Sequence, residues 1–411
     1  MRRVLAALIL AAVLLLSGCH FLSSDSSAPE STPASSAGEQ VNAVWEKNWC
    51  YQRLSPPLQE NYAAIYTAVK DGFRQDEMVT VSGEERLGIR ISLPQEVTSE
   101  ADMTLLYTAF ITDTPGFFHL GNAYSYEGYH VGEDNRYTAI SLVYVMDAAA
   151  RAEAKAKLDA AVDEIVRGIP AGADAFETEL YLHDTLLARC VYDEEAAASS
   201  RPAAEYPHVF SAYGALVNGR AVCEGYSRAF QLLLRAAGIE ATLVTGQSRE
   251  GEPHMWNLVT VDGYTYHVDP TWDWTESGTR HTYFNLTTAD ILLSHTLDES
   301  NIGIDTCTAT AANYFVRTGR FVSSLATKEQ LAGLVADALA DNPETIELRF
   351  AENQYTGSML LLSTNPRWFT AVVNEAMRDT GRVLESYRAE TDDLYHIVAL
   401  TDLRQKNPEF S

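Results

Sequence analysis

The stretch HMWNLVTVDGYTYHVD, residues 254–269, constrains the fold more than any other part of the chain. Both of its halves suit β-strands, and the Asp-Gly pair at residues 262–263 is a strong signal for a two-residue hairpin turn. That turn sets Asp269 opposite Trp256 on the neighbouring strand. The sequence therefore predicts an antiparallel hairpin with a defined register.

The predicted register brings a histidine and a carboxylate together. His254 lies two residues beyond Trp256 on one strand and therefore on the same face. His254 and Asp269 become diagonal neighbours, roughly 7–8 Å apart at the backbone, which is within reach of a side-chain hydrogen bond. The other histidine of the hairpin, His267, is expected to point to the opposite face from Asp269. We therefore take His254 as the histidine that acts with Asp269.

A cysteine opens the amphipathic segment CEGYSRAFQLLLRAAGIEA, residues 223–241. The free backbone N–H groups in the first turn of a helix carry partial positive charge, which favours a thiolate. A thiol nucleophile is activated by an imidazole, which a carboxylate or amide orients. Cys223, His254 and Asp269 supply these groups. Each alone has a plainer explanation, as an inert cysteine, a core histidine or a turn-forming Asp before proline.

The stretch AYGALVNGRAVCEGYSRAFQLLLRAAGIEATLVTGQ, followed by HMWNLVTVDGYTYHVDPTWDW, resembles the bacterial transglutaminase-like superfamily. The resemblance extends back to LHDTLLARCVYDEE and forward to YFNLT, roughly residues 180–300. It implies a papain-like α+β fold, in which a helix bearing the cysteine packs on a small antiparallel sheet. It also implies that Cys223 is the nucleophile, His254 the base and Asp269 the residue that orients it.

Acyl transfer through a thioester is the chemistry that these residues predict. The resembling family contains amide cross-linkers, peptidases and inactive members, so the direction of the reaction stays open, and an inactive binding module is the alternative. The backbone N–H of Cys223 is the natural first oxyanion donor. Tyr192, Tyr213 and Tyr226 are alternatives for the second. No cofactor and no metal are expected, because the chain contains no CxxC pair and no HExxH motif.

The N-terminus reads as an export signal. MRR is a positive n-region, VLAALILAAVLLL is a short apolar run and SGC follows directly. Residues 16–19, LSGC, resemble the lipobox of bacterial lipoproteins, which are cleaved before the cysteine and lipidated on it. The sequence thus predicts a signal peptide over 1–18 and a lipid on Cys19, which would hold the protein outside the cytoplasm on the bacterial membrane. The alternative is an ordinary signal peptide that ends in cysteine.

Composition divides the remainder of the chain. Residues 19–43 are rich in Ser, Ala and Pro and predict a flexible tether. We expect an N-terminal α/β region over 44–170, the transglutaminase-like domain over 171–308 and a small α/β unit over 309–411. Hydrophobic periodicity and cap signals predict the elements of the outer parts: strands at 87–93, 123–131, 136–146, 344–350 and 394–403, and helices at 55–73, 148–170, from 174, 327–342 and 365–381.

The formal net charge of −26 argues against a nucleic-acid partner, because a phosphate backbone would repel the chain. The expected partners are a peptide, protein or cell-wall substrate, together with the membrane through Cys19. Three further thiols, Cys50, Cys190 and Cys307, would allow one disulfide in an oxidising compartment. The sequence does not say which two would pair.

Overall fold

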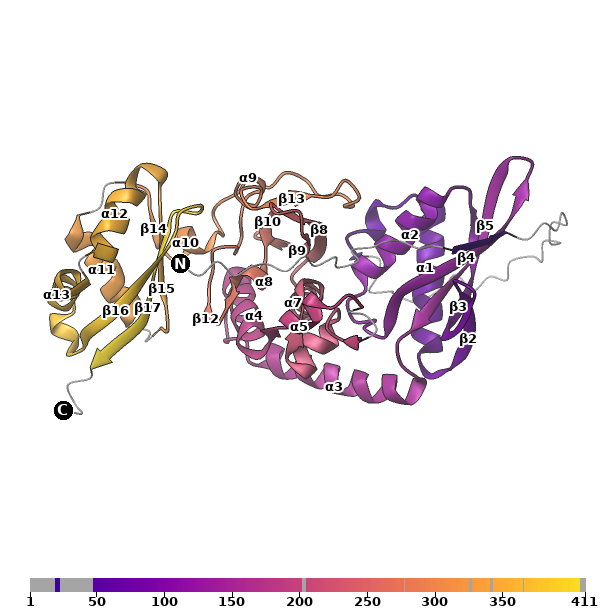
Figure 1. Cartoon of the computed structure of the whole chain (residues 1–411), viewed down its shortest axis with the longest axis horizontal. Coiled ribbons are helices and arrows are strands. Elements are labelled where there is room, and N and C mark those ends of the chain that lie inside the picture. The colour runs from indigo at the N-terminus through magenta and orange to yellow at the C-terminus, as the bar shows by residue number, and fades with distance from the viewer. Residues whose placement is uncertain are drawn as a thin grey trace.

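A computed structural model describes residues 19–22, 47–201, 205–276, 278–324, 327–340, 343–364 and 366–406. Three bodies follow one another along the long axis (Figure 1), and we call them the N-terminal region, the central domain and the C-terminal unit. The predicted signal peptide and residues 23–43 of the predicted tether lie outside the described residues. Residues 19–22, at the start of the predicted tether, form a strand, β1.

The N-terminal region is a five-stranded sheet in the order β1-β4-β5-β3-β2. Its edge strand β1 pairs in parallel with β4, and the other pairs are antiparallel. Helix α2 was not predicted, because its apolar residues do not keep to one face; it lies between this sheet and the central domain. The elements are β1 (Cys19–Leu22), α1 (Pro56–Asp71), β2 (Glu77–Val81), β3 (Glu84–Val97), α2 (Glu100–Asp113), β4 (Leu120–Val131), β5 (Asp134–Tyr144) and α3 (Ala148–Arg167).

The central domain packs one helix on a four-stranded antiparallel sheet, as the resemblance implied. Helix α7 (Cys223–Ala236) lies against β9 and β8 in a sheet of order β10-β9-β8-β13. The long helix α3 runs along this domain and the N-terminal region (Figure 1). The other elements are α4 (Ala175–Arg189), β6 (Val191–Tyr192), α5 (Glu194–Ala198), β7 (Arg220–Ala221), β8 (Ala241–Ser248), β9 (Pro253–Val261), β10 (Tyr264–Val268), α8 (Pro270–Asp273), β11 (Trp274–Thr275), β12 (Gly278–Thr279), α9 (Thr288–Ile291) and β13 (His295–Leu297).

The C-terminal unit is a four-stranded sheet of order β14-β15-β17-β16 with three longer helices. The predicted helices α11 and α13 and strands β15 and β17 are confirmed, whereas α12 and β16 were not predicted. The elements are α10 (Tyr314–Arg317), β14 (Phe321–Val322), α11 (Lys328–Leu339), β15 (Ile346–Phe350), α12 (Glu352–Thr364), α13 (Pro366–Ala376), β16 (Val383–Asp392) and β17 (Ile397–Lys406).

Among the described residues, two large hydrophobic cores and two small clusters hold these bodies together. The N-terminal region and the central domain share one continuous core, which includes Phe110 of α2, Phe230 of α7 and Trp256 of β9. The C-terminal unit has its own core, around Leu348 and Phe369. None of the helices in the described part of the chain is both long enough and apolar enough to cross a membrane.

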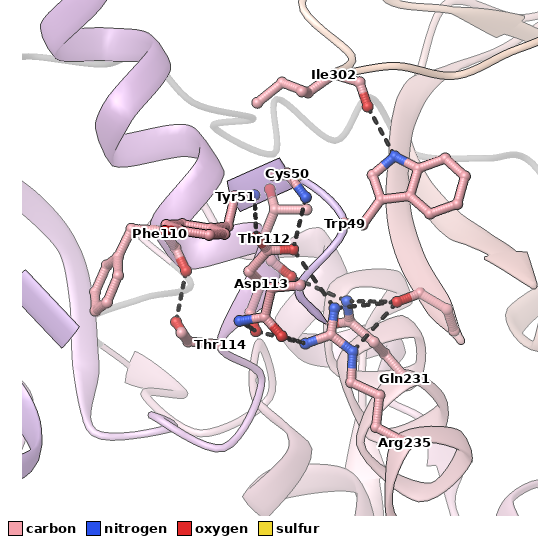
Figure 2. Close-up of polar contacts among 12 residues, drawn as sticks. Trp49, Cys50, Tyr51, Phe110, Thr112, Asp113, Thr114, Gln231, Arg235 and Ile302 are labelled. Carbon is pink, nitrogen blue, oxygen red and sulfur yellow. Dashed lines mark hydrogen bonds and ion pairs between the residues drawn. The ribbon is translucent and has the colours of Figure 1, made fainter. Parts of the chain in front are cut away.

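At the C-terminal end of α7, a buried ion pair joins the N-terminal region to the central domain (Figure 2). Asp113 is 2% exposed, and its carboxylate accepts hydrogen bonds from the backbone N–H groups of Cys50 (3.1 Å) and Tyr51 (2.9 Å). Arg235 lies 3.5 Å from the same carboxylate and donates to the backbone carbonyls of Asp113 (2.5 Å) and Ala241 (3.1 Å). Three separate segments therefore fix this end of the helix.

Candidate active site

Cys223 is the first residue of helix α7. The residue before it, Val222, has no polar side chain that could cap the helix, so the N–H groups of the first turn keep their partial positive charge beside the thiol. A loop crosses this end of the helix, where Val222 N–H donates to the carbonyl of Val209 at 3.1 Å. Only a glycine fits beneath that loop, because a Cβ on Gly225 would lie 2.3 Å from the Val209 carbonyl oxygen.

Two polar side chains hold α7 against strand β9. Ser227 Oγ lies 2.9 Å from the carbonyl of Cys223, one turn earlier, and 2.9 Å from the carbonyl of Met255 on the strand. Asn257 Nδ2 donates to the carbonyl of Ser227 at 2.9 Å, and Asn257 is fully buried. These bonds fix the start of the helix beside the part of β9 that carries His254.

The hairpin has the predicted register. Val261 pairs with Tyr264, and Val268 with Asn257. The predicted hydrogen bond is present, with His254 Nε2 2.7 Å from Asp269 Oδ2. The thiol of Cys223 lies on the other side of His254, close enough to help raise the pKa of the imidazole. Because Asp269 engages Nε2, Nδ1 is the ring nitrogen that remains for the thiol. The structure therefore brings Cys223, His254 and Asp269 together in that order.

The charges of the site favour an imidazolium. His254 is 7% exposed, and burial alone would lower its pKa; Asp269, together with Cys223, outweighs burial and raises the pKa of His254 to about 10. Asp269 is fully buried, and burial raises its pKa, but His254 and His295 lower the pKa by more, so that it falls below the usual range. His254 is therefore protonated at neutral pH and faces an ionised Asp269 on one side and the thiol on the other.

Asp269 also caps a helix. Its Oδ1 accepts from the backbone N–H groups of Thr271 (3.0 Å) and Trp272 (3.3 Å) at the start of α8. Its Oδ2 accepts a second imidazole contact, from Nε2 of His295 at 3.2 Å. Sequence reasoning missed His295, because a single histidine in a three-residue strand carries no local signal. The carboxylate thus contacts four N–H donors, two on each oxygen.

The expectation that His267 points away from Asp269 is wrong. Residues two apart in a strand share a face, so His267 lies on the face of Asp269 and Trp256. His267 Nδ1 accepts from the indole N–H of Trp256 at 3.0 Å, and its Nε2 lies 3.1 Å from Thr288 Oγ1. Burial, helped by His295, lowers the pKa of His267 to about 4. His267 is excluded as the base because both of its nitrogens are engaged, and not because of its face.

The three tyrosines considered as oxyanion donors lie in different places. The Tyr226 hydroxyl donates to the carbonyl of Cys190 at 2.6 Å in the core, and the Tyr213 ring stacks on Phe118 at 5.4 Å. Tyr192 lies beside the site, since burial and then the charge of Cys223 raise the pKa of its hydroxyl. Tyr192 is therefore the tyrosine of the three that lies near the thiol.

The other described thiols are free and buried. Burial raises the pKa of Cys50 far above its ordinary value and the pKa of Cys190 to about 12, and it also raises the pKa of Cys307. None of the four thiols at positions 50, 190, 223 and 307 forms a disulfide. The Cys19 side chain lies outside the described part of the structure, so the lipidation of Cys19 stays a prediction.

A pocket opens next to the start of α7, between the N-terminal region and the central domain. Its charged lining is the ion pair of Glu224 and Arg228, which are 2.9 Å apart and belong to α7. Its aromatic lining is mostly from the N-terminal region and comprises Tyr107, Phe117, Phe118 and Phe210. The pocket therefore offers apolar surface and one ion pair within the first two turns of the helix that begins at Cys223.

Two groups of described residues have the ligand types that could hold a metal ion: His254, Asp269 and His295, and His183, Asp184 and His281. In each group the imidazole nitrogens already contact the carboxylate, at 2.7 and 3.2 Å in the first and at 2.9 and 3.0 Å in the second. Hydrogen bonding therefore accounts for both groups.

The geometry can be compared with known proteins. Residues 160–270 match the transglutaminase-like superfamily. The match ends one residue after Asp269 and includes Cys223, His254 and Asp269. The central domain therefore has the fold that the sequence resemblance implied, and the matched segment contains Cys223, His254 and Asp269 in the expected order. No curated protein matches the chain.

Solved structures with low identity also match parts of the chain. A transglutaminase crystal structure is 17% identical, with a TM-score of 0.27 over 46% of this chain and 52% of the other. A candidate cysteine protease from Cytophaga hutchinsonii is 16% identical, with a TM-score of 0.23 over 36% and 56%. A candidate protease from Parabacteroides distasonis is 14% identical, with a TM-score of 0.22 over 32% and 28%. The chain spans about half the length of the first of these.

Proposed function

We propose that the protein is a cysteine acyl-transfer enzyme that cleaves or transamidates peptide, protein or cell-envelope amides through a thioester on Cys223. The observation that carries the proposal is the buried pair of His254 and Asp269, 2.7 Å apart, beside a cysteine at an uncapped helix start. The match of residues 160–270 to the transglutaminase-like superfamily supports it.

The reaction proceeds in two stages. The Cys223 thiolate attacks the amide carbonyl carbon, a C–S bond forms, and the backbone N–H of Cys223 stabilises the oxyanion. The His254 imidazolium donates its proton to the amide nitrogen, the C–N bond breaks, and the amine departs. The acyl group remains on Cys223 as a thioester. His254 then accepts a proton from water or a primary amine, which attacks the thioester and expels the thiolate. Water gives an acid and an amine gives a new amide.

The enzyme is proposed to work outside the cytoplasm, held on the membrane by a lipid on Cys19. The support is the lipobox-like LSGC that directly follows the apolar run of residues 4–16. Metabolic labelling with a fatty-acid analogue tests the anchor, since the label should be lost in Cys19→Ser and the soluble variant should keep its thiol reactivity. A Cys19→Ser variant that is still labelled would show that another residue carries the lipid.

Thiol labelling tests the site before any substrate is known. Brief iodoacetamide treatment at mildly acid pH, followed by mass mapping, should modify Cys223 first. The imidazolium of His254 favours its thiolate, whereas burial raises the pKa of the thiols of Cys50, Cys190 and Cys307. His254→Ala should remove this preference and should lower any amide cleavage by roughly 10²–10⁴-fold, the usual worth of general acid–base catalysis.

Turnover then separates the two directions of the reaction. A library of peptides and cell-wall fragments, incubated with and without a primary amine, reports hydrolysis as a new acid and transamidation as a new amide.

In the labelling experiment, modification of a buried cysteine before Cys223 would contradict the assignment of the nucleophile. Early labelling of Cys223 without turnover of any amide would instead favour a binding module that keeps the site.

A further inference from the structure

We infer that His295 positions the carboxylate of Asp269, and that Tyr395 of the C-terminal unit fixes His295 through Ser294. The inference rests on the proposed function, since it assigns a role relative to the triad. It adds two positioning residues and makes the C-terminal unit part of the active-site architecture.

The first link is between His295 and Asp269. His295 is 1% exposed and begins the edge strand β13, where it pairs with Ser248 of β8. Its Nε2 lies 3.2 Å from the Asp269 oxygen that also accepts from His254. The other oxygen of Asp269 is held by the start of α8. The donor from His295 therefore leaves the carboxylate a single orientation, with one oxygen facing the two imidazoles.

The second link crosses from the transglutaminase-like domain to the C-terminal unit. His295 Nδ1 lies 2.7 Å from Ser294 Oγ, and Ser294 Oγ lies 2.7 Å from the Tyr395 hydroxyl. Tyr395 sits in the connection between β16 and β17 and is 1% exposed, and its hydroxyl is also 3.2 Å from the carbonyl of Asp290. The two bodies lie side by side in the molecule (Figure 1).

The hydrogen bonds have a consistent direction. The Tyr395 hydroxyl lies closer to Ser294 Oγ (2.7 Å) than to the carbonyl of Asp290 (3.2 Å), so we assign its proton to Ser294 and the Ser294 proton to Nδ1 of His295. A neutral imidazole that accepts at Nδ1 carries its proton at Nε2, and that proton is donated to Asp269. The Tyr395 hydroxyl thus selects the tautomer of His295 that supports the carboxylate. Ser294 Oγ is also 3.4 Å from the carbonyl of Ile291, and this acceptor competes more strongly for the Ser294 proton when the Tyr395 hydroxyl is absent.

The residues of this hydrogen-bonded chain are buried; they are Asp269, His295, Ser294 and Tyr395. Aromatic rings surround His295. The His295 ring lies 4.3 Å from the Trp272 ring and 4.9 Å from the Trp256 ring, between centroids. The titratable groups around Asp269 come from several elements, and the pH dependence of the site reflects all of them. They are His254 on β9, His295 on β13, Tyr192 on β6, Tyr283 after β12 and, beyond His254, Cys223 on α7.

Tyr395→Phe is the sharpest test, because it removes one hydroxyl and leaves the transglutaminase-like domain unchanged. We expect the rate of Cys223 alkylation at mildly acid pH to fall about two- to tenfold, the usual effect of one buried hydrogen bond. The rate at alkaline pH should change little. The matched control is Tyr387→Phe, which removes a buried hydroxyl that donates to the carbonyl of Leu362 inside the C-terminal unit. Its pH profile should be that of the wild type.

His295 is tested with a pair of variants. His295→Ala should lower the acid-pH rate by more than Tyr395→Phe does, and His295→Gln should recover part of it, because the amide can still donate to Asp269. In the double variant Tyr395→Phe with Ser294→Ala, the acid-pH alkylation rate of Cys223 should be no lower than in the slower of the two single variants. Both substitutions break the same series of hydrogen bonds, so their effects should not add. If His295→Ala does not fold, as judged by thermal melting, the comparison of Tyr395→Phe with Tyr387→Phe decides alone.

The outcomes separate the inference from the proposed function. If wild-type Cys223 shows no preference for labelling at acid pH, the proposed function fails. If wild-type Cys223 does show that preference, and Tyr395→Phe and His295→Ala label at the wild-type rate at every pH, the inference fails while the proposed function stands. A Tyr387→Phe profile that falls as far as that of Tyr395→Phe would also overturn it, because the effect would then belong to the C-terminal unit as a whole.

Discussion

Asp269 shows how one side chain can serve the fold and the chemistry together. A short carboxylate before a proline is a usual helix cap, and Asp269 is one, because its Oδ1 accepts from two N–H groups of α8. Its Oδ2 is turned toward His254 and His295. The cap determines which oxygen of Asp269 remains for His254, so one rotamer of Asp269 meets both its structural role and its proposed catalytic role.

Asp269→Asn should therefore be costly in two ways. An amide offers one acceptor oxygen, and its NH₂ group must face either the N–H donors of α8 or those of the imidazoles. We expect at least a tenfold lower amide-cleavage rate and a loss of about 1 kcal/mol or more of folding free energy, the usual cost of a lost cap. Steady-state kinetics and urea denaturation measure the two effects.

The control for this substitution is Asp147→Asn. Asp147 caps α3 by accepting from Ala150 N–H at 2.8 Å, and it is exposed. Asn caps about as well as Asp, so this variant should match the wild type in both measurements. An Asp269→Asn enzyme that also matched the wild type would show that neither the charge nor the second acceptor is used.

At the scale of elements, the start of α7 depends on a close approach of backbone to backbone. The loop that carries Val209 lies directly on Gly225, and the carbonyl of Val209 accepts from Val222 N–H. The loop thus holds Val222, the residue that precedes Cys223. A helix start positioned this way needs glycine for space rather than for an unusual backbone angle.

Gly225→Ala should disturb both stability and reactivity. The new Cβ would lie 2.3 Å from a carbonyl oxygen and 2.7 Å from Ala221 Cβ, so the loop must shift. We expect a loss of about 1–3 kcal/mol, which is typical of overpacking, and slower alkylation of Cys223 at acid pH. Chemical denaturation and mass mapping measure the two effects.

Gly333→Ala is the matched control, because Gly333 is also inside a helix, α11, and nothing lies within 4 Å of the place that the new methyl group would take. Gly333→Ala should raise the free energy of unfolding by up to about 1 kcal/mol, because alanine is a better helix former than glycine. Equal losses at both glycines would show that the close contact at Gly225 is not what matters.

At the scale of the whole molecule, a second chain of contacts links the C-terminal unit to the helix that Asp269 caps. Glu347 of β15 lies 2.9 Å from Nδ1 of His281, and Nε2 of His281 lies 3.0 Å from Asp184. Asp184 also contacts His183 at 2.9 Å, and His183 lies 3.3 Å from Asp273 of α8. Acids and imidazoles alternate, so each charge is offset by its neighbours.

Glu347→Ala should weaken this connection. Burial lowers the pKa of His281, but Tyr314, Asp184 and Glu347 together raise it well above 6.5. Removing one partner of a buried pair costs about 3 kcal/mol or more. A histidine whose pKa is raised on folding stabilises fully below its unfolded pKa and less as the pH rises through the folded one. The difference from the wild type should therefore be largest below pH 6.5 and should shrink in alkali.

Urea denaturation at acid and alkaline pH measures this difference. Glu205→Ala serves as the control, because Glu205 pairs with Arg201 at 3.0 Å on the surface and its loss should leave stability unchanged at either pH. A Glu347→Ala difference that grew with pH would mean that His281 is neutral in the folded protein.

The sequence predicted the local parts of the site and missed those that depend on distant packing. The turn fixed the hairpin register, and the register placed His254 beside Asp269. The expectation for His267 failed on the same rule, because residues two apart share a face. His295 reaches Asp269 from 26 residues away and Tyr395 reaches Ser294 from 101 residues away, so no spacing pattern could predict either contact.

The core shared by the N-terminal region and the transglutaminase-like domain limits how the protein can be shortened for laboratory work. An expressed fragment that began at residue 160, where the family match begins, would lack Phe110 and Asp113. It would expose the apolar side of α7 and leave Arg235 without its carboxylate, and such surfaces promote aggregation. A protein fragment that stays folded and does not aggregate during crystallisation or inhibitor screening should therefore begin no later than residue 47.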